Sequence, residues 1–409
     1  MLNVKIYIQD HLSSFRMILI SFVLMILTGA FLLCLPCAST GAEEVTFLDA
    51  LFTSTSAACV TGLVVFDTAS QWTLFGRTVI LILIQIGGVV RFMRFLVAGT
   101  FCIEGIGALC LLPVFAGQFG LWKGLGYAIF HSVSAFCNAG FDLMGTQQQF
   151  SSLTSFSANA AVNITIMLLI ILGGLGFLTW SDLISCRFRL RKLRLQSKII
   201  LTSTAALILL PALYFYFCEF RGNSGSERLL LSLFQAVTPR TAGFNTADYA
   251  QMSEGSWLIT IILMMIGGAP GSTAGGMKVT TMAVLLLSSG TFLHRRNQVN
   301  CFHRRIENDA IRNAMALLTL YIFLLLGGTL LISSMEELPI LPSMFECASA
   351  LGTVGLTTGI TTGLCSLSKA LLISFMFFGR IGGLTLGYAF ASSAVTNIGR
   401  MPVEKVSVG

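Results

Sequence analysis

The chain has 409 residues, of which 55% are hydrophobic and 11% charged, and its mean hydropathy is +0.83. These values exclude a soluble globular protein, in which about a quarter of the residues are charged. Much of the basic charge behind the net +7 is gathered into two blocks, which indicates membrane topology and not nucleic-acid binding. We expect an all-α polytopic membrane protein.

The first predicted element is an apolar run at 15–35, long enough for the ~20 residues with which a helix crosses the hydrocarbon core. Its apolar core is too long for a cleavable signal peptide, so we expect it to remain as a span. The next apolar stretch, 47–58, is too short to cross and is expected to enter from outside and stop half way. A short inner helix at about 72–86 completes this first unit.

The same order of outer helix, re-entrant helix and inner helix is predicted three more times. The further re-entrant stretches are expected at 126–136, 228–238 and 342–350, and further long spans at 160–180, 199–217, 311–333 and 371–391. Four units would give eight spans, with both termini on the cytoplasmic side. The resulting fold class is four parallel helix–re-entrant pore loop–helix repeats around a pseudo-fourfold pore.

Four aligned segments carry this repeat. They read "SAACVTGL", "SAFCNAGF", "VTPRTAGF" and "SALGTVGL", and their common glycines are Gly62, Gly140, Gly243 and Gly355. A phenylalanine stands ten residues before the glycine in three copies and nine before it in the third; these are Phe52, Phe130, Phe345 and, in the third copy, Phe234. Repetition at matched positions is the signature of a repeat architecture.

Charged residues agree with this topology. The basic blocks comprise Arg187, Arg189, Arg191, Lys192, Arg194 and Lys198, and Arg295, Arg296, Arg304, Arg305 and Arg312. Such blocks mark cytoplasmic loops. The opposite connections carry acids such as Glu43, Glu219 and Glu336, which fits an external face.

Nothing in the sequence indicates catalysis. The eleven cysteines are scattered singly, without a Cys-x-x-Cys pair, and the four histidines form no cluster. We expect the cysteines to be small buried hydrophobes. The chain is therefore not expected to be an enzyme or to hold a metal cofactor of its own.

The glycine-containing segments predict a cation filter. Non-helical backbone at membrane depth is tolerated only where protein buries it or where it lines a watery path. Carbonyls of residues 60–62, 138–140, 241–243 and 353–355 can point at one axis and replace the water around a dehydrated cation. The helix C-termini add partial negative charge there. One such glycine alone would indicate close packing, whereas four matched copies favour a filter.

Acidic residues are absent from these segments, so backbone oxygens favour K⁺ or Na⁺ over a divalent cation. Asp67 and Asp142 follow the first two glycines closely. They are expected either to draw cations to the entrance or to be solvated loop acids.

The third inner helix is interrupted by "GGAPGSTAGG" at 267–276. Met277 then precedes Lys278, so the Gly-Lys-Ser/Thr of a phosphate-binding loop is missing. Below the filter, an unwound segment can act as a gate; a static kink is the alternative. Arg380, alone in an apolar run, is expected beside the pore and engaged by the loop's carbonyls or hydroxyls, or else in a structural salt bridge. Lys278 is expected to line the cavity or to snorkel.

Five ordered motifs resemble the Trk/Ktr/HKT superfamily of potassium transporters, most closely its bacterial KtrB subunits. They are "LFTSTSAACVTGLVVFDT", "FHSVSAFCNAGFDL", "FQAVTPRTAGFNT", "GGAPGSTAGGMKVTT" and "SALGTVGLTTGIT". The resemblance covers residues 14–398. It implies a K⁺-translocating subunit of a bacterial inner membrane, stimulated by Na⁺ in many members. It also implies a homodimer on a cytosolic ring of nucleotide-binding regulatory subunits of the RCK or KtrA type. No cofactor is implied besides the transported K⁺.

The resemblance also assigns site residues. The filter backbone falls on Val60, Thr61, Gly62, Asn138, Ala139, Gly140, Thr241, Ala242, Gly243, Thr353, Val354 and Gly355. The gate falls on Gly267, Gly268, Ala269, Pro270, Gly271, Ser272, Thr273, Ala274, Gly275 and Gly276, and on Arg380, with Lys278 beside the loop.

The expected pore units are 13–90, 91–186, 187–296 and 297–398, followed by a cytoplasmic tail at 399–409. Family members carry a longer connection after the first "QIGG", whereas here Gly88 leads almost directly to Phe95. This shortening leaves open how the first unit ends and engages a regulator. The alternative function is a secondary transporter of another solute, which would show inverted repeats and charged residues at the midplane.

Overall fold

The computed structural model describes residues 14–89, 94–146, 149–295 and 298–382. Its four long outer helices are α2 (Ser14–Leu33), α6 (Arg94–Phe119), α10 (Leu195–Tyr214, extended by the π-helical turn Phe215–Glu219) and α14 (Asn308–Glu336). Each packs against a short pore helix that follows it: α3 (Phe47–Ala58), α7 (Leu121–Phe136), α11 (Gly225–Val237) and α15 (Ile340–Gly352). Short helices are therefore present at the four stretches predicted to be re-entrant, and their depth in the membrane stays a prediction.

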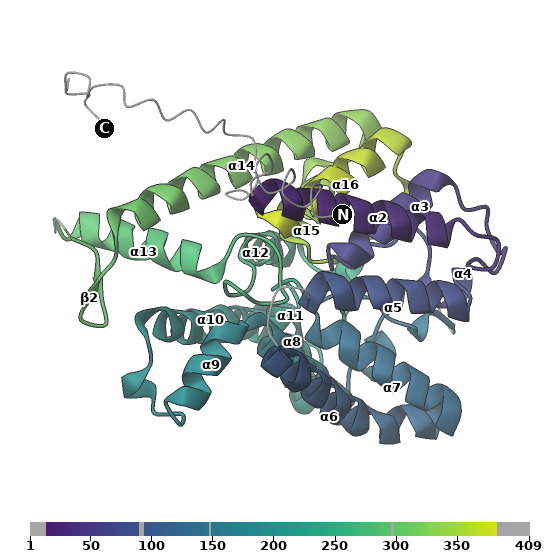
Figure 1. Ribbon diagram of the computed structural model, residues 1–409, viewed down its shortest axis with the longest axis horizontal. Helices are drawn as coiled ribbons and strands as arrows, with labels where there is room; N and C mark the ends of the chain where they lie inside the picture. The colour runs from purple at the N-terminus through teal and green to yellow at the C-terminus, as the bar shows by residue number, and fades with distance from the viewer. Residues whose placement is uncertain (1–13, 90–93, 147–148, 296–297, 383–409) are drawn as a thin grey trace, which may run out of the picture.

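The inner helices complete four units, which we number one to four along the chain. They are α5 (Leu74–Val89), α8 (Ala160–Gly174) with α9 (Phe177–Ser185), α12 (Glu254–Met265) with α13 (Val279–Leu293), and α16 (Ser366–Ile381). The inner helix of each unit packs against the pore helix of the next: α5 on α7, α8 on α11, α12 on α15, and α16 on α3. The last contact closes a ring, and Figure 1 shows the yellow α16 beside the purple α2 and α3.

The remaining described elements are short. They are the helix α4 (Thr68–Gln71), the single turns Met144–Thr146, Thr154–Phe156, Leu190–Lys192, Tyr249–Gln251 and Thr361–Gly363, and the antiparallel strands β1 (Asn300–Cys301) and β2 (Arg304–Arg305). The prediction of an all-α fold is confirmed.

Local sequence fixes the start of the first pore helix. The Thr46 hydroxyl oxygen accepts from the Asp49 backbone N–H, and the Asp49 carboxylate accepts from the Thr46 N–H, at 3.3 and 3.4 Å. This capping box satisfies donors that the first helical turn leaves without partners. Asp49 also forms an ion pair with Lys369 Nζ at 2.9 Å, which ties unit one to unit four.

The predicted spans agree with the structure in part. Three helices in the described residues are long and apolar enough to cross a membrane alone: Gly99–Phe119, Leu195–Glu219 and Asn308–Glu336. The last two confirm the spans expected at 199–217 and 311–333. Residues 15–35 correspond to α2, and 371–391 begins in α16 and continues outside the described residues. The inner helices are shorter, so the total of eight spans stays a prediction.

One predicted span, 160–180, is wrong as a continuous helix. The chain bends by 91° between α8 and α9. The carbonyls of Gly173 and Gly174 accept hydrogen bonds from Thr273 N (3.3 Å) and Ala269 N (2.9 Å), about a hundred residues away. Backbone N–H groups of the intramembrane loop thus bond to the carbonyls that the break in the helix leaves open. The sequence of α8 alone does not indicate that this loop packs there.

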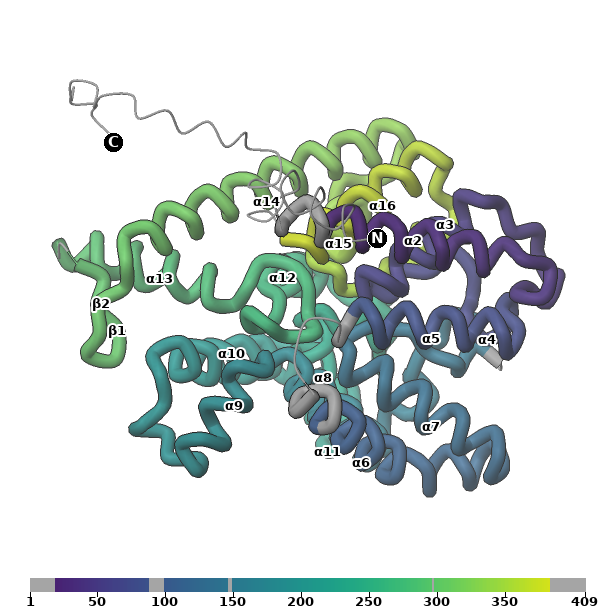
Figure 2. The backbone as a smooth tube through the Cα atoms, viewed as in Figure 1, coloured from purple at the N-terminus to yellow at the C-terminus, as the bar shows by residue number. Residues whose placement is uncertain are grey.

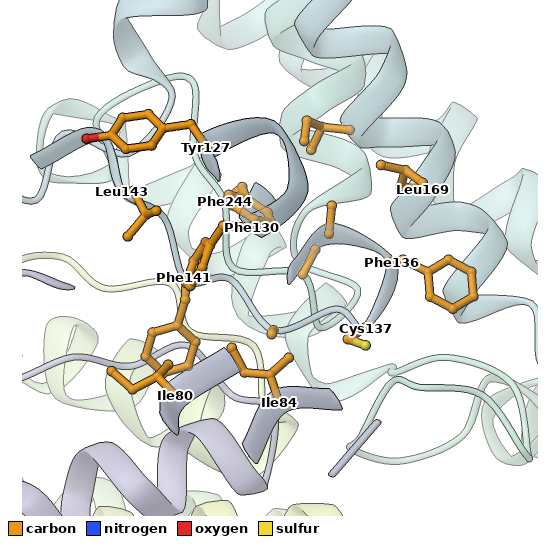
Figure 3. Packing of buried hydrophobic residues seen from close by; sticks show 14 of the residues in the cluster. Ile80, Ile84, Tyr127, Phe130, Phe136, Cys137, Phe141, Leu143, Leu169 and Phe244 are labelled. Carbon is orange, nitrogen blue, oxygen red and sulfur yellow. The ribbon is translucent and has the colours of Figure 1, made fainter. Parts of the chain in front are cut away.

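The core lies behind the filter loops. The four motif phenylalanines are buried, with exposed fractions from 0% to 4%. Figure 3 shows Phe130, Phe141 and Phe244 packing with Tyr127 and with Ile80 and Ile84. These side chains come from units one, two and three, which share this apolar cluster. A second cluster joins units one, three and four.

Candidate functional site

The four predicted filter segments share one backbone conformation. The residue two positions before each glycine is left-handed, with φ of +56° at Val60 and Asn138, +68° at Thr241 and +52° at Thr353. The four glycines have φ between +72° and +92°. A positive φ is uncommon outside glycine. Its recurrence at matched positions shows that the repeat extends from the sequence to the backbone itself.

The four glycines also form a closed ring. A Cβ added at Gly62 would lie 2.5 Å from the carbonyl oxygen of Ala139 in the next unit. The same approach recurs around the ring, at 2.8 Å from Gly140 to Ala242 O, 2.4 Å from Gly243 to Val354 O and 2.2 Å from Gly355 to Thr61 O. Real Cβ atoms do not come this close to a carbonyl, so glycine is required both for its φ and for this contact.

The pore helices end at the ring in two ways. In units one, two and four the residue before the glycine donates its N–H to a serine carbonyl five residues back, at 2.8 Å in each case; these serines are Ser56, Ser134 and Ser349. In unit three Ala242 N donates to Thr238 O, four residues back, at 3.0 Å. This closure is one residue tighter, which accounts for the phenylalanine standing nine residues before Gly243.

Three filter hydroxyls are buried within the described part of the chain and bond to no protein atom there. They belong to Thr61, Thr241 and Thr353. Leaving a buried hydroxyl without a hydrogen bond costs about 1–3 kcal/mol. The ring therefore combines backbone carbonyls with three hydroxyl oxygens whose lone pairs are free to bind a cation.

A cavity of about 290 Å³ lies over one side of the ring. Gly243 and Gly355 line it, together with loop residues that include the exposed Asp248. Asp248 also caps the following turn, because its carboxylate accepts from Ala250 N at 3.0 Å. Sequence reasoning missed this acid, since it stands five residues beyond its glycine and outside the filter motif.

Of the two acids predicted at the entrance, Asp67 connects two loops. Asp67 accepts from Ala69 N, Ser70 N and Phe150 N at 2.9–3.1 Å, and it is 7% exposed. The interpretation of Asp67 as a solvated loop acid is wrong, because its carboxylate is buried and accepts hydrogen bonds from three backbone N–H groups.

Asp142 accepts from Met144 N at 3.0 Å. Burial raises the pKa of Asp142 to about 6, and the neighbouring Asp67 carboxylate adds to this effect. The attraction of cations by either acid stays a prediction.

The loop at 267–276 connects α12 to α13 and lies against the filter, near the middle of the molecule in Figure 2. A Cβ added at Gly275 would lie 2.0 Å from Thr353 Oγ1. Thr273 Oγ1 donates to Phe136 O at 3.1 Å and lies 3.2 Å from the side-chain amide of Asn138. The predicted gate thus contacts filter residues of units two and four.

The two predicted basic residues both bind loop carbonyls. The Arg380 guanidinium donates to Thr273 O in the loop and to Gly87 O at the end of α5. The expectation that loop carbonyls engage its charge is confirmed. Lys278 turns back on the loop, and its Nζ donates to Ala274 O at 2.8 Å. This contact argues against snorkelling, and the lining of the cavity by Lys278 stays a prediction.

Sequence reasoning also missed Glu104, a carboxyl inside the long helix α6. It is 4% exposed, and its Oε2 lies 3.5 Å from Gln85 Nε2. The sequence did contain a signal for Glu104, because it is a lone acid in an apolar run. Such residues cost free energy in a membrane and usually pair with another polar group.

Comparison with known proteins places the chain in a family. The family model described as TrkH, cation transport protein, matches residues 94–397. The potassium/sodium uptake protein NtpJ of Enterococcus hirae is 36% identical, over 98% of both chains. The Ktr system potassium uptake protein B of Bacillus subtilis is 36% identical, over 96% of both chains.

The fold has a solved counterpart. The crystal structure of the potassium transporter TrkH from Vibrio parahaemolyticus superposes with a TM-score of 0.72 at 19% identity, over 93% of this chain and 85% of that one. At this identity the likeness concerns the fold. Together with the near full-length relatives, it leads to one conclusion: the chain belongs to the TrkH family of cation transport proteins.

Proposed function

We propose that this chain translocates K⁺ across the bacterial inner membrane through the ring formed by Gly62, Gly140, Gly243 and Gly355. The observation that carries the proposal is the closed ring itself, in which each glycine faces a carbonyl oxygen of the next unit. Its relatives of similar length are named for potassium or potassium/sodium uptake.

The chemistry of the ring suits a monovalent cation. Carbonyl oxygens replace the hydration shell of K⁺, and the hydroxyls of Thr61, Thr241 and Thr353 are available beside them. The C-terminal ends of the four pore helices add partial negative charge. The filter segments contain no carboxylate, so a divalent cation would lack the charged ligands it prefers.

The loop at 267–276 is the proposed gate of this pathway. It touches the filter at Asn138 and Thr353, and Arg380 links it to the end of α5. Its five glycines let the backbone change conformation at little steric cost. Movement of the loop away from the filter would open the cytoplasmic half of the pore.

The proposed assembly is the one that the resemblance to this family implies. The chain forms a homodimer on a cytosolic ring of nucleotide-binding regulatory subunits, with both termini cytoplasmic and with Na⁺ as an activator. The pore units are 13–90, 91–186, 187–296 and 297–398, and 399–409 is a cytoplasmic tail. The chain carries no cofactor and binds no nucleic acid. The short connection from Gly88 to Phe95 includes residues outside the described ranges.

Complementation tests the function directly. Expression in a bacterium without K⁺ uptake systems is expected to restore growth at limiting K⁺, with Rb⁺ uptake that rises when Na⁺ is added. A filter variant such as Gly62→Ser, inserted at the same level, serves as the control and is expected to lose K⁺ selectivity. Normal membrane insertion without growth or Rb⁺ uptake would refute the proposal.

A further inference from the structure

Each pore helix carries a polar residue directly after its buried phenylalanine. The four pairs are Phe52–Thr53, Phe130–His131, Phe234–Gln235 and Phe345–Glu346, and the polar members are 0–2% exposed. The phenylalanines mark matched places in the ring, so the polar residues occupy matched places too. A buried polar side chain in a membrane protein costs free energy unless it is bonded, which makes its partners informative.

Two of these residues bind the chain just beyond the filter. His131 Nε2 accepts from the backbone N–H of Leu143 at 3.3 Å. The Glu346 carboxylate accepts from the backbone N–H of Thr358, also at 3.3 Å. Leu143 stands three residues after Gly140, and Thr358 three residues after Gly355. Units two and four therefore contain the same hydrogen bond, which we call the outer clamp, made by two different residues.

The surroundings of His131 fix its ring for this role. Nδ1 lies 2.7 Å from the carbonyl oxygen of Tyr127, which can only accept, so the proton is on Nδ1 and Nε2 is the acceptor. The rings of Phe115 and Phe130 stand 5.3 and 6.0 Å away between centroids. Figure 3 shows Leu143 beside Tyr127 and Phe141. Both ends of the bond are buried, since His131 is 0% and Leu143 5% exposed.

Glu346 holds a longer piece of the loop. Besides Thr358 N–H, its oxygens accept from the hydroxyls of Thr357 and Thr361, the latter at 2.8 Å. Thr357 and Thr358 line the cavity over the ring together with Gly355. A carboxylate inside the pore helix thus fixes one wall of that cavity to the rigid part of unit four.

Units one and three lack the outer clamp, although in unit three the Thr238 hydroxyl donates to the carbonyl of Phe244, directly after Gly243. The Thr53 hydroxyl donates to Asp49 O within its own helix, at 2.9 Å. The side-chain amide of Gln235 bonds to no atom in the part of the chain that the structure describes. Because the units follow one another around the ring, the two clamped units lie diagonally across it.

We propose that His131 and Glu346 are positioning residues for the outer end of the filter, and that this diagonal pair of clamps sets its discrimination between K⁺ and Na⁺. The inference rests on the proposed function. A carbonyl filter discriminates by the spacing and number of its oxygens. A bond from the packed pore helix to the N–H three residues after the glycine limits how far those oxygens can close around the smaller ion.

The test compares near-isosteric variants in cells without other K⁺ uptake. His131→Phe keeps a ring in the aromatic cluster but removes the acceptor, and Glu346→Leu removes the carboxylate. Glu346→Gln keeps a carbonyl oxygen for Thr358 N–H. Thr53→Val is the matched control, because it changes the equivalent residue of unit one, which makes no clamp. The readout is the Rb⁺ uptake rate as a function of competing Na⁺, normalised to the chain in the membrane.

His131→Phe and Glu346→Leu are expected to lower the preference for Rb⁺ over Na⁺ by roughly tenfold, the factor that one buried hydrogen bond corresponds to. In Glu346→Gln and Thr53→Val this preference is expected to stay within about twofold of that of the unmodified chain. Glu346→Gln keeps the clamp of unit four, and unit one has no clamp to lose. A purely structural role would lower the amount of inserted protein and leave the ratio unchanged.

Three results would overturn the inference. They are an unchanged ratio in both clamp variants, an equal loss in Thr53→Val, and a loss in Glu346→Gln as large as in Glu346→Leu. The two clamps lie in different units. If one of the variants His131→Phe and Glu346→Leu fails to insert, the selectivity of the other still tests the inference. Absence of Rb⁺ uptake by the unmodified chain would instead refute the proposed function itself, so the two failures are distinguishable.

Discussion

Replacing Gly355 by alanine tests whether the ring depends on the close approach between units. Gly355 has φ +92°, a region that costs an alanine about 1–2 kcal/mol. Its new Cβ would also stand 2.2 Å from Thr61 O and 2.8 Å from the Cα of Gly62. Both neighbours are backbone atoms, so the filter segments of units one and four must move apart.

The expected effect combines the backbone strain at residue 355 with the displacement of the two filter segments. Strain and displacement together should amount to about 2 kcal/mol or more, and each 1.4 kcal/mol corresponds to a factor of ten. We therefore expect the preference for K⁺ over Na⁺ to fall by more than about tenfold, while the chain still inserts. Growth at limiting K⁺ with increasing Na⁺, together with Rb⁺ uptake, measures this preference.

Gly41→Ala is the matched control for this experiment. Gly41 has a similar φ of +78°, but a Cβ there would meet no atom within 4 Å. It carries the backbone strain without the contact, so selectivity should be unchanged. Wild-type selectivity in Gly355→Ala, or an equal loss in Gly41→Ala, would show that the approach between units does not set selectivity.

Three further outcomes are expected. Deleting residues 271–275 should raise Rb⁺ flux and reduce its dependence on a regulator, and unchanged flux would contradict the gate. Arg380→Ala should raise flux about tenfold, because hydrogen bonds to a charged group are worth about 1.5–3 kcal/mol; Arg312→Ala, which removes an exposed ion pair with Asp309, is its control. The raised pKa of Asp142, about 6 against 3.8, means that its protonated form stabilises the fold, fully below pH 3.8 and less as pH rises through 6. The unfolding temperature should therefore fall over this range in the wild type but not in Asp142→Asn, and equal pH dependence in both would refute the assignment.

Local signals were strong enough to predict most elements. Phe47–Ala58 was expected as a re-entrant helix with the same bounds, because a short apolar stretch between long ones has few other solutions in a membrane. The filter glycines were found from repetition alone, since the φ and the approach that require glycine recur in every unit. The break at 267–276 was visible because glycine and proline do not continue a helix.

The sequence could not predict contacts between distant segments. The bend at Gly174 depends on a loop that follows about a hundred residues later. The burial of Asp67 depends on the N–H of Phe150, and the equivalence of His131 and Glu346 depends on where Leu143 and Thr358 return to the pore helices. No local pattern encodes these partners.

The sequence by itself thus determined a membrane fold, its four repeats and the glycines of a cation filter, because composition, apolar length and repetition are properties of the chain alone. Only the tertiary structure decided that the ring closes from Gly355 to Thr61 and that Arg380 holds the loop through carbonyls. It also showed which pore helices clamp the filter. These depend on carbonyls and side chains that meet only when four units close around one axis.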